Sequence, residues 1–417
     1  MIKIGIIGCG RILNAHLNAY KRIREAGYDN FRITALVDIV EENALRHVKR
    51  GEGPPPLPPV VSEDSDDSYN TPHVYLSDFQ DDVDVQVFTD YRDMLEHGDV
   101  NAVNDMTAIF MHHEIGKATL SAGKHLLSQK PPGLTVAGGA EVVELAKKAG
   151  VTYGIFESLR DERGPRAMGW AVQHGLIGDP RMAVAVGVDA EWSPDKVVAD
   201  TPWRHDKLKA VGHCSIDWGV HFFDFMRYVV GEVEWVSAET KVFEKTRYRR
   251  DQAGNVIAKV DCETDDTFFA LMGFENGAIG QIAWSIAAHG EEFYLPGTFL
   301  VYGSEGCIKA GEIIRDDGTR DTLLDRFERD MTDEEREQFY PLGIKDDHFA
   351  LQQLDWLKAI DAGTNPEVDG EEGLKDLACC YAVLESAVAG CRVAVKDVLS
   401  GKVARFQEEI DAHYGIS

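Results

Sequence analysis

The sequence predicts an α/β protein with an N-terminal Rossmann-type, doubly wound parallel sheet and a C-terminal α+β domain with a large, mostly antiparallel open sheet. Three observations lead to this prediction. Short apolar strands alternate with amphipathic stretches over residues 1–150, as in repeated βαβ units. Longer strand-like runs replace this alternation from about residue 182. The 417 residues also suffice for two separate cores.

The first domain, residues 1–150, opens with the strand-like IKIGIIG and a helix from about Arg11. Further strands are expected at ITALVD, NAVNDM and HLLSQ, and helices around DYRDMLE, EIGKATLSAG and VVELAKKAG. The run VTYGIF, residues 151–156, is expected to be one more strand that leads into the second domain.

The second domain, residues 151–417, is expected to bind substrate and to mediate oligomerisation. Its runs DTFFALMGF and AIGQIAWSIA are joined through Asn276-Gly277, which is the strongest short signal for a β-hairpin. Residues 347–394 are predicted to be helical.

Residues 51–84 fit neither pattern, because GPPPLPP and SEDSDDS offer little to a core. Proline-rich and acidic serine-rich stretches form extended or mobile loops. We interpret the segment as an insertion between the second helix and the third strand. It is either a disordered surface loop or, alternatively, a lid or an oligomer arm.

Composition limits the partners and the compartment. Acidic residues outnumber basic ones by 71 to 43, and the net charge of −28 opposes binding to nucleic acid or to an anionic membrane. The seven cysteines show no C-x-x-C spacing, which indicates free thiols in a reducing cytoplasm. No signal sequence and no apolar run of bilayer length is present, so we expect a soluble, cytoplasmic protein.

The motif GIIGCGRIL predicts a dinucleotide site. Gly8 would make the tight turn, Gly10 would let the backbone approach a pyrophosphate, and the following helix would supply free N–H groups. Leu13 stands at the third fingerprint position, so we expect the helix to sit differently or the loop to open. Asp38 ends the second strand, where a carboxylate accepts from both ribose hydroxyls and repels a 2′-phosphate. We therefore predict NAD, with NADP disfavoured.

Hydride transfer from an alcohol also needs a base and a group that steadies the oxyanion. Lys130 ends the fifth strand, at the sheet edge where such folds bind ligands, and Pro131 restricts its backbone.

Asp217 and His221 are four residues apart, and so lie on one face of a predicted helix among aromatic residues. An aspartate there can orient and stabilise an imidazolium. The alternative is a core histidine with Asp217 as a helix cap. A metal site formed with His213 is conceivable, but we predict no metal.

These motifs resemble those of the glucose-fructose oxidoreductase and inositol dehydrogenase family, Gfo/Idh/MocA. The run SAGKHLLSQKP resembles its Glu-Lys-Pro signature, with Gln129 in place of the glutamate. Further similarities are GIIGCGR, VFTDYRDML, the His112-His113-Glu114 run, WRHD, IDWGVHFFD and FENGAIG. The correspondence covers nearly the whole chain outside residues 51–84.

The resemblance implies that Lys130, Asp217 and His221 are catalytic, that the substrate is a sugar, an inositol or a glycoside, and that the protein is a homodimer or a homotetramer. With Arg160, the three catalytic residues would also bind substrate. The expected cofactor-binding residues are Gly8, Gly10, Arg11, Ile12, Asp38, Thr107, His112, Gln129, Lys130, Trp203 and Arg204. Taken alone, Trp203-Arg204 would equally suit a stacked surface pair. Gln129 removes a formal charge beside the lysine but keeps an amide that can hydrogen-bond.

We therefore expect an NAD-dependent dehydrogenase in which His221 is the base, Asp217 orients it, and Lys130 binds the reacting oxygen and relays a proton. One alternative is a glycosidase that retains NAD and works by transient oxidation and elimination. Another is a dinucleotide-sensing regulator without activity, which would have no need of the three catalytic residues together.

Overall fold

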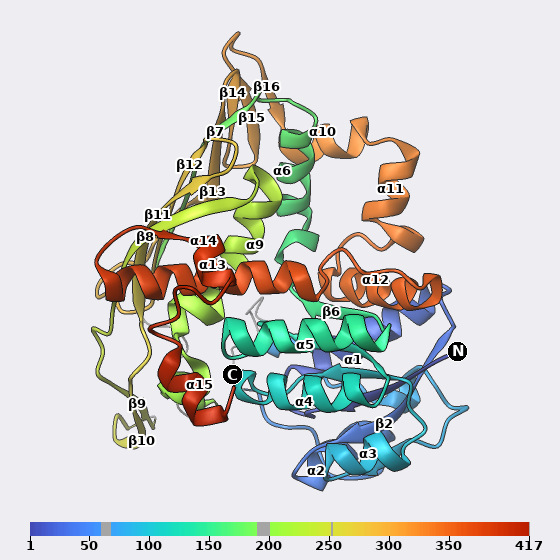
Figure 1. Ribbon diagram of the computed structural model, residues 1–417. Helices are drawn as coiled ribbons and strands as arrows, with labels where there is room; N and C mark the ends of the chain where they lie inside the picture. Colours follow the sequence, from blue (N-terminus) through green and yellow to red (C-terminus); the bar gives the residue numbers. More distant parts are fainter. Residues whose placement is uncertain (60–67, 190–200, 252, 417) are drawn as a thin grey trace. The chain divides into compact units, whose positions relative to one another are not determined.

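A computed structural model describes residues 1–59, 68–189, 201–251 and 253–416 of the chain (Figure 1). The chain divides into two compact units. Unit 1 comprises residues 1–133, 138–158 and 340–373, and unit 2 comprises residues 134–137, 159–339 and 374–417. Residues 60–67 of the predicted insertion lie outside the described residues, so the lid or oligomer-arm interpretation remains a prediction. The disordered-loop interpretation is wrong for residues 68–84, because Val74 and Leu76 are buried in the core of unit 1.

Unit 1 contains the predicted six-stranded parallel sheet, with strand order β3-β2-β1-β4-β5-β6. This is the doubly wound order of dinucleotide-binding folds, so the predicted class is confirmed. The strands are β1 (Ile2–Ile7), β2 (Phe31–Val37), β3 (Gln86–Phe88), β4 (Ala102–Asp105), β5 (His125–Gln129) and β6 (Tyr153–Phe156). The helices are α1 (Leu13–Glu25), α2 (Glu41–Val48), α3 (Tyr91–His97), α4 (Ile109–Ser121), α5 (Val136–Ala149) and α12 (His348–Ala362), with short 3-10 turns at η1 (Ser68–Asn70), η2 (Leu76–Asp78) and η6 (Pro341–Gly343).

The helix α12 departs from the expected division at residue 150, because it packs with the first unit. Leu354, Trp356 and Leu357 are fully buried in the same core cluster as Leu13 and Leu17 of α1. An apolar helix face must be buried against some element, but sequence order does not say which.

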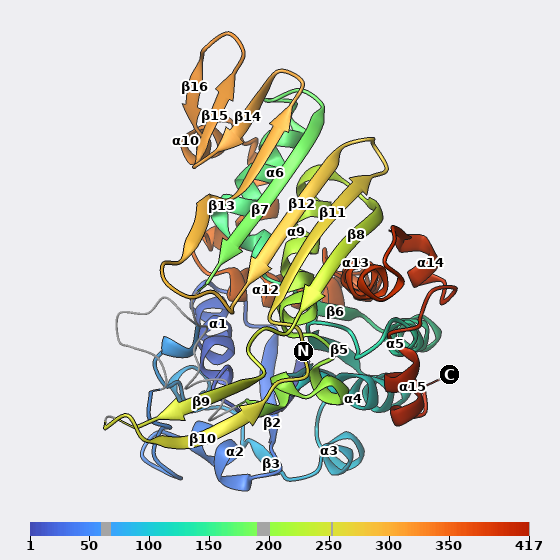
Figure 2. The ribbon, with the colours of Figure 1, turned by 90° about the vertical axis from the view of Figure 1, so that its left-hand side faces the viewer.

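Unit 2 contains a nine-stranded sheet with the order β16-β15-β14-β13-β7-β12-β11-β8-β17 (Figure 2). Only the β7–β12 pair is parallel among its described strand pairs, as predicted for a mostly antiparallel sheet. Its strands are β7 (Pro180–Val188), β8 (Val233–Lys241), β11 (Thr267–Phe274), β12 (Ile279–Ser285), β13 (Phe293–Gly303), β14 (Gly306–Lys309), β15 (Glu312–Arg315), β16 (Arg320–Thr322) and β17 (Val393–Ala394). A separate hairpin joins β9 (Thr246–Arg250) to β10 (Val256–Asp261).

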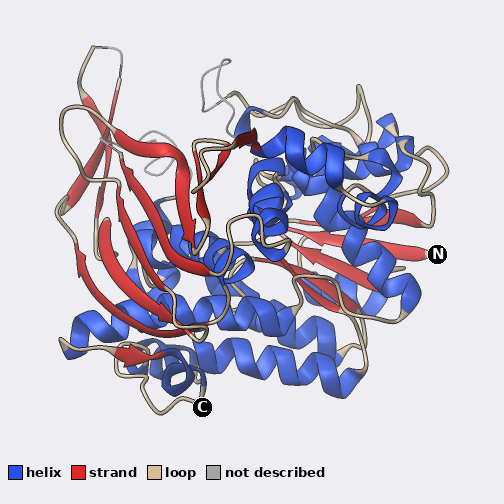
Figure 3. Ribbon diagram, turned by 90° about the horizontal axis from the view of Figure 1, so that it is seen from above, coloured by secondary structure: helices blue, strands red, loops and turns tan. Residues whose placement is uncertain are grey.

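Helices lie along one face of the nine-stranded sheet, which is curved in Figure 3. The helical segments of unit 2 are η3 (Leu159–Asp161), α6 (Arg163–Gln173), η4 (Pro202–His205), α8 (Lys207–Ala210), η5 (His213–Trp218), α9 (Gly219–Val230), α10 (Leu323–Asp330), α11 (Asp333–Phe339), α13 (Gly370–Ala389, which begins in unit 1), α14 (Val395–Leu399) and α15 (Glu408–Tyr414). Side chains alternate along a strand, so Phe268 and Ala270 are buried while Phe269 and Leu271 are exposed.

The predicted hairpin at Asn276-Gly277 joins β11 to β12. Gly277 has φ +88°, a conformation that side chains disfavour, and the Asn276 side chain accepts from Ala278 N at 3.0 Å. Turn chemistry therefore sets the register of these two strands.

Candidate active site

The glycine-rich loop of unit 1 follows β1. Gly8 has φ +94°, and a Cβ there would lie 2.9 Å from the Met106 carbonyl oxygen, so only glycine suits this turn. A Cβ on Gly10 would meet no atom within 4 Å, so the loop borders open space at the second glycine. Gly8 thus makes the predicted tight turn, and the open space at Gly10 is compatible with the close backbone approach predicted for it.

Asp38 closes the loop from the end of β2. Its Oδ2 accepts from Cys9 N at 2.9 Å, and its Oδ1 accepts from Val40 N at 2.9 Å and Asn43 Nδ2 at 3.1 Å. A carboxylate has about four acceptor sites, so these three bonds leave capacity for a further donor. Open space at Gly10 beside a fixed carboxylate suits a dinucleotide whose ribose hydroxyls reach Asp38.

The start of α1 carries three further residues of interest. Ile12 is the residue before the helix, and Leu13 is fully buried in the core of unit 1. Leu13, which stands where the fingerprint has a third glycine, therefore adds an apolar contact between α1 and the core of unit 1. The guanidinium of Arg11 donates to the Pro58 carbonyl at 2.5 Å, so the described part of the insertion contacts the residue after Gly10.

The ends of β4 and β5 are joined by His112 of α4. One ring nitrogen, Nδ1, lies 2.9 Å from the Pro131 carbonyl oxygen, and the other, Nε2, lies 3.1 Å from that of Thr107. The Thr107 hydroxyl donates to Asp105 at 2.7 Å. The half-buried Lys130 comes directly after β5, so His112 holds the backbone next to the predicted catalytic lysine.

Gln129, the other unusual residue of this motif, contacts a buried histidine of α1. Gln129 Nε2 lies 2.7 Å from His16 Nε2, and Gln353 Nε2 of α12 lies 2.8 Å from His16 Nδ1. His16 is completely buried against the rings of Phe156 and Phe349, and burial lowers its pKa to about 3. Its imidazole is therefore neutral at pH 7.

In unit 2, Asp217 and His221 occupy two successive helices. Asp217 lies in the π-helix η5, and His221 lies in the first turn of α9. The predicted four-residue spacing therefore spans a change of helix type, which the sequence pattern did not reveal. Short π-helical turns are frequent at functional sites.

Asp217 forms an ion pair with Arg204, whose Nε lies 2.8 Å from Asp217 Oδ2. The guanidinium of Arg204 also stacks on Trp203 at 4.6 Å. The Trp203-Arg204 stack, which the sequence left as an alternative to cofactor binding, is present, and the same arginine contacts a predicted catalytic carboxylate.

Asp265, which no sequence motif singled out, anchors the π-helix. This buried carboxylate accepts from Ser215 N at 2.8 Å and from the Ser215 hydroxyl at 2.7 Å, and burial raises its pKa to about 6. A Cβ on Gly212 would lie 2.5 Å from Asp265 Oδ1, so a side chain there would displace this carboxylate from its position. A sequence feature that could have drawn attention to Asp265 is the Asp265-Asp266 pair, which stands where the predicted strand DTFFALMGF begins.

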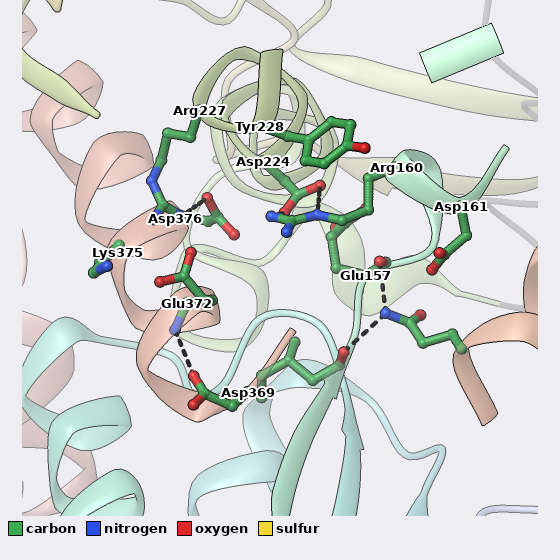
Figure 4. A network of polar contacts seen from close by, with 12 residues as sticks. Glu157, Arg160, Asp161, Asp224, Arg227, Tyr228, Asp369, Glu372, Lys375 and Asp376 are labelled. Atoms are coloured by element: carbon green, nitrogen blue, oxygen red, sulfur yellow. Dashed lines mark hydrogen bonds and ion pairs between the residues drawn. The ribbon is translucent and has the colours of Figure 1, made fainter. Parts of the chain in front are cut away.

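Arg160, a predicted substrate contact, is buried in unit 2 and paired with Asp224. Its Nε donates to Asp224 Oδ2 at 3.0 Å, and its Nη2 contacts Asp224 Oδ1. Figure 4 shows this pair beside a second buried pair, in which Arg227 Nη1 lies 2.6 Å from Asp376 Oδ1.

A metal centre and a membrane span each set requirements that the described residues would have to meet. No group of three or more histidine, cysteine, aspartate or glutamate side chains within the described ranges is arranged to hold a metal ion. No helix found among those residues combines the length and the apolar character that crossing a membrane requires.

The doubly wound sheet, the glycine turn and the Asp38 carboxylate define a dinucleotide-binding α/β protein. Comparison with family models makes this specific. Residues 60–156 match the model described as an oxidoreductase family with an NAD-binding Rossmann fold, and residues 166–309 match the GFO/IDH/MocA C-terminal domain. Together the matches cover more than half of the chain, which therefore belongs to the GFO/IDH/MocA family of NAD-binding oxidoreductases.

Individual relatives agree with this assignment. Myo-inositol 2-dehydrogenase of Thermotoga maritima is 26% identical over 400 residues, covering 95% of this chain and 100% of that protein. Levoglucosan dehydrogenase of Pseudarthrobacter phenanthrenivorans is 26% identical over 254 residues, covering 59% of this chain and 63% of that protein. A solved levoglucosan dehydrogenase in complex with NADH and L-sorbose has the same fold, with a TM-score of 0.71 at 20% identity over 95% of this chain and 100% of that one.

Proposed function

We propose that the protein is an NAD-dependent dehydrogenase that transfers hydride between the nicotinamide and a secondary hydroxyl of a sugar, an inositol or a glycoside. The observation that carries the proposal is the glycine loop closed by Asp38, in a chain of an NAD-binding oxidoreductase family. The relatives named as dehydrogenases of myo-inositol and levoglucosan support the substrate class. Asp38 favours NAD over NADP, because a carboxylate repels a 2′-phosphate.

The residues proposed to hold the cofactor surround the loop and the strand ends. Gly8, Gly10, Arg11 and Ile12 would face the pyrophosphate, and Asp38 the ribose. Around the nicotinamide we place Thr107, His112, Gln129, Lys130, Trp203 and Arg204.

Bound NAD would accept a hydride from the carbon that carries the hydroxyl. The chain's own side chains would manage the proton. His221 takes it from the hydroxyl, and Asp217, held by Arg204, stabilises the resulting imidazolium. Lys130 donates a hydrogen bond to the reacting oxygen and relays the proton onward. Arg160, fixed by Asp224, is the further proposed substrate contact.

The test mixes the protein with NAD and a panel of inositols, sugars and glycosides and follows the absorbance of reduced nicotinamide. Lys130→Met and His221→Asn should each lower kcat by about 10²- to 10⁴-fold, the usual contribution of a positioned acid or base. Lys117→Met is the matched control, because Lys117 pairs with Glu141 on the surface of unit 1. Full activity of Lys130→Met, or no turnover on any panel member, would contradict the proposal. Release of an aglycone without net reduction of NAD would favour the glycosidase alternative.

We also propose a cytoplasmic homodimer or homotetramer. Exposed apolar side chains on β7, β11 and β12 support association through the sheet face: Met182, Phe269, Leu271 and Ile279. The seven cysteines are all free thiols, which suits a reducing compartment. Sedimentation equilibrium of the full chain, compared with Leu271→Glu, would measure the assembly.

A further inference from the structure

The contacts of Gln129 explain why an amide stands where the family signature has an acid. Three segments of unit 1 meet at His16: α1, which follows the glycine loop, the end of β5, and α12. His16 lies between two carboxamides, with ring-to-amide distances of 2.7 Å to Gln129 and 2.8 Å to Gln353. Both ring nitrogens of the buried histidine are thus occupied.

We propose that Gln129, His16 and Gln353 form an uncharged hydrogen-bonded chain that positions the end of β5, and with it Lys130, without placing a negative charge beside that lysine. These three are positioning residues. The inference rests on the proposed function, because its consequence for catalysis acts through Lys130.

The chemistry of the three groups supports an uncharged chain. A neutral imidazole has one donor and one acceptor nitrogen, and a carboxamide offers both an oxygen and an NH₂ group. Both amide nitrogens face the ring, so the neutral imidazole can accept from only one of them. The Oε1 atom of Gln353 is buried without a hydrogen-bond partner among the described residues, and turning that amide about its last bond lets this oxygen accept from the other ring nitrogen. Two aromatic rings, Phe156 at 4.5 Å and Phe349 at 5.0 Å, complete the surroundings of the imidazole and disfavour a charge on it.

An acid at position 129 would break this neutrality. A glutamate can only accept when it is ionised, so it would lie as a partly buried anion against His16 or draw a proton onto that ring. Either result places fixed charge next to Lys130. The carboxylate form would favour the protonated amine of the lysine and so delay its loss of a proton as the pH rises.

The first measurement needs no substrate. In the ¹⁵N-histidine-labelled full chain, the His16 signals, assigned by their absence in His16→Gln, should show one neutral tautomer without titration between pH 5 and pH 9. In Gln129→Glu, the same signals should become those of an imidazolium below about pH 7. A His16 that titrates near its ordinary pKa in the unmodified chain would overturn the proposal, whether or not the protein turns over any polyol.

The second measurement is the pH profile of kcat/KM on whichever panel substrate is active. Gln129→Glu should displace its falling limb to higher pH by about one pH unit, because a new negative charge favours the protonated, hydrogen-bond-donating form of Lys130. Gln80→Glu is the matched control, because Gln80 is a buried glutamine of unit 1 that instead binds both backbone groups of Ile33, at 3.0 and 2.7 Å. Equal displacement by both variants, or none by Gln129→Glu, would overturn the proposal. If Gln129→Glu does not fold, the spectrum of the unmodified chain still decides.

Discussion

Two buried polar clusters, one in each unit, are built in opposite ways. Unit 1 places His16 between Gln129 and Gln353 without a charge, whereas unit 2 buries two ion pairs, Arg160–Asp224 and Arg227–Asp376. A row of uncharged hydrogen-bonded side chains creates no net charge next to its neighbours. A buried ion pair fixes both side chains, but removing either one leaves the other as an uncompensated buried charge. The uncharged arrangement lies next in sequence to Lys130, the residue that we propose relays a proton.

Removing one partner of a buried ion pair should have the largest effect. Asp224→Asn leaves the Arg160 guanidinium buried without its counter-charge, so we expect a loss of about 3–5 kcal/mol in the free energy of unfolding. Denaturation in urea measures it. Asp99→Asn, which breaks the exposed Lys3–Asp99 pair, should cost less than about 1 kcal/mol. Similar losses of unfolding free energy in Asp224→Asn and Asp99→Asn would contradict the expected difference between a buried and an exposed ion pair.

The buried neutral His16 should lower the free energy of unfolding at acid pH. Burial lowers the pKa of His16 to about 3, so between pH 6.5 and pH 3 the unfolded chain binds a proton that the folded chain does not. Stability is therefore flat above about pH 6.5 and falls below it, by about 2 kcal/mol at pH 5 from His16 alone.

The variant His16→Gln isolates this contribution from the other buried histidines. Its loss of stability between pH 7.5 and pH 5 should be about 2 kcal/mol smaller than that of the unmodified chain. Chemical denaturation at the two pH values gives both differences. Identical differences would show that folding leaves the pKa of His16 unchanged.

Asp265 of unit 2 should respond to acid with the opposite sign and the smallest effect. Burial raises its pKa to about 6, so between pH 6 and its unfolded pKa near 4 the folded chain binds the extra proton. Its contribution therefore rises by about 1 kcal/mol between pH 7 and pH 5. In Asp265→Asn this gain should be absent, as measured by the same denaturation series. An unchanged pH difference would rule out protonation of Asp265 in this range.

The sequence predicted both sheets, the Asn276-Gly277 hairpin and the glycine turn, because each depends on local periodicity or turn chemistry. It did not predict that α12 packs on α1, since an apolar helix face does not identify its partner. Nor did it predict the histidine between Gln129 and Gln353, because His16 and Gln353 lie 337 residues apart. The ion pair of Asp217 with Arg204 is likewise a tertiary contact that no local pattern encodes.

Unit 1 is built from three separate segments of the chain, and this affects how it folds during synthesis. Its core is completed by residues 340–373, so the helix that carries the nucleotide loop lacks its packing partner until those residues leave the ribosome. At about 5–20 residues per second, synthesis from residue 158 to residue 373 takes roughly 10–40 s. For that interval the part of α1 that packs on α12 is open to chaperones, while the part that packs on the sheet can already be covered. A fragment that stops at residue 158 would keep the α12-contacting part of α1 exposed permanently.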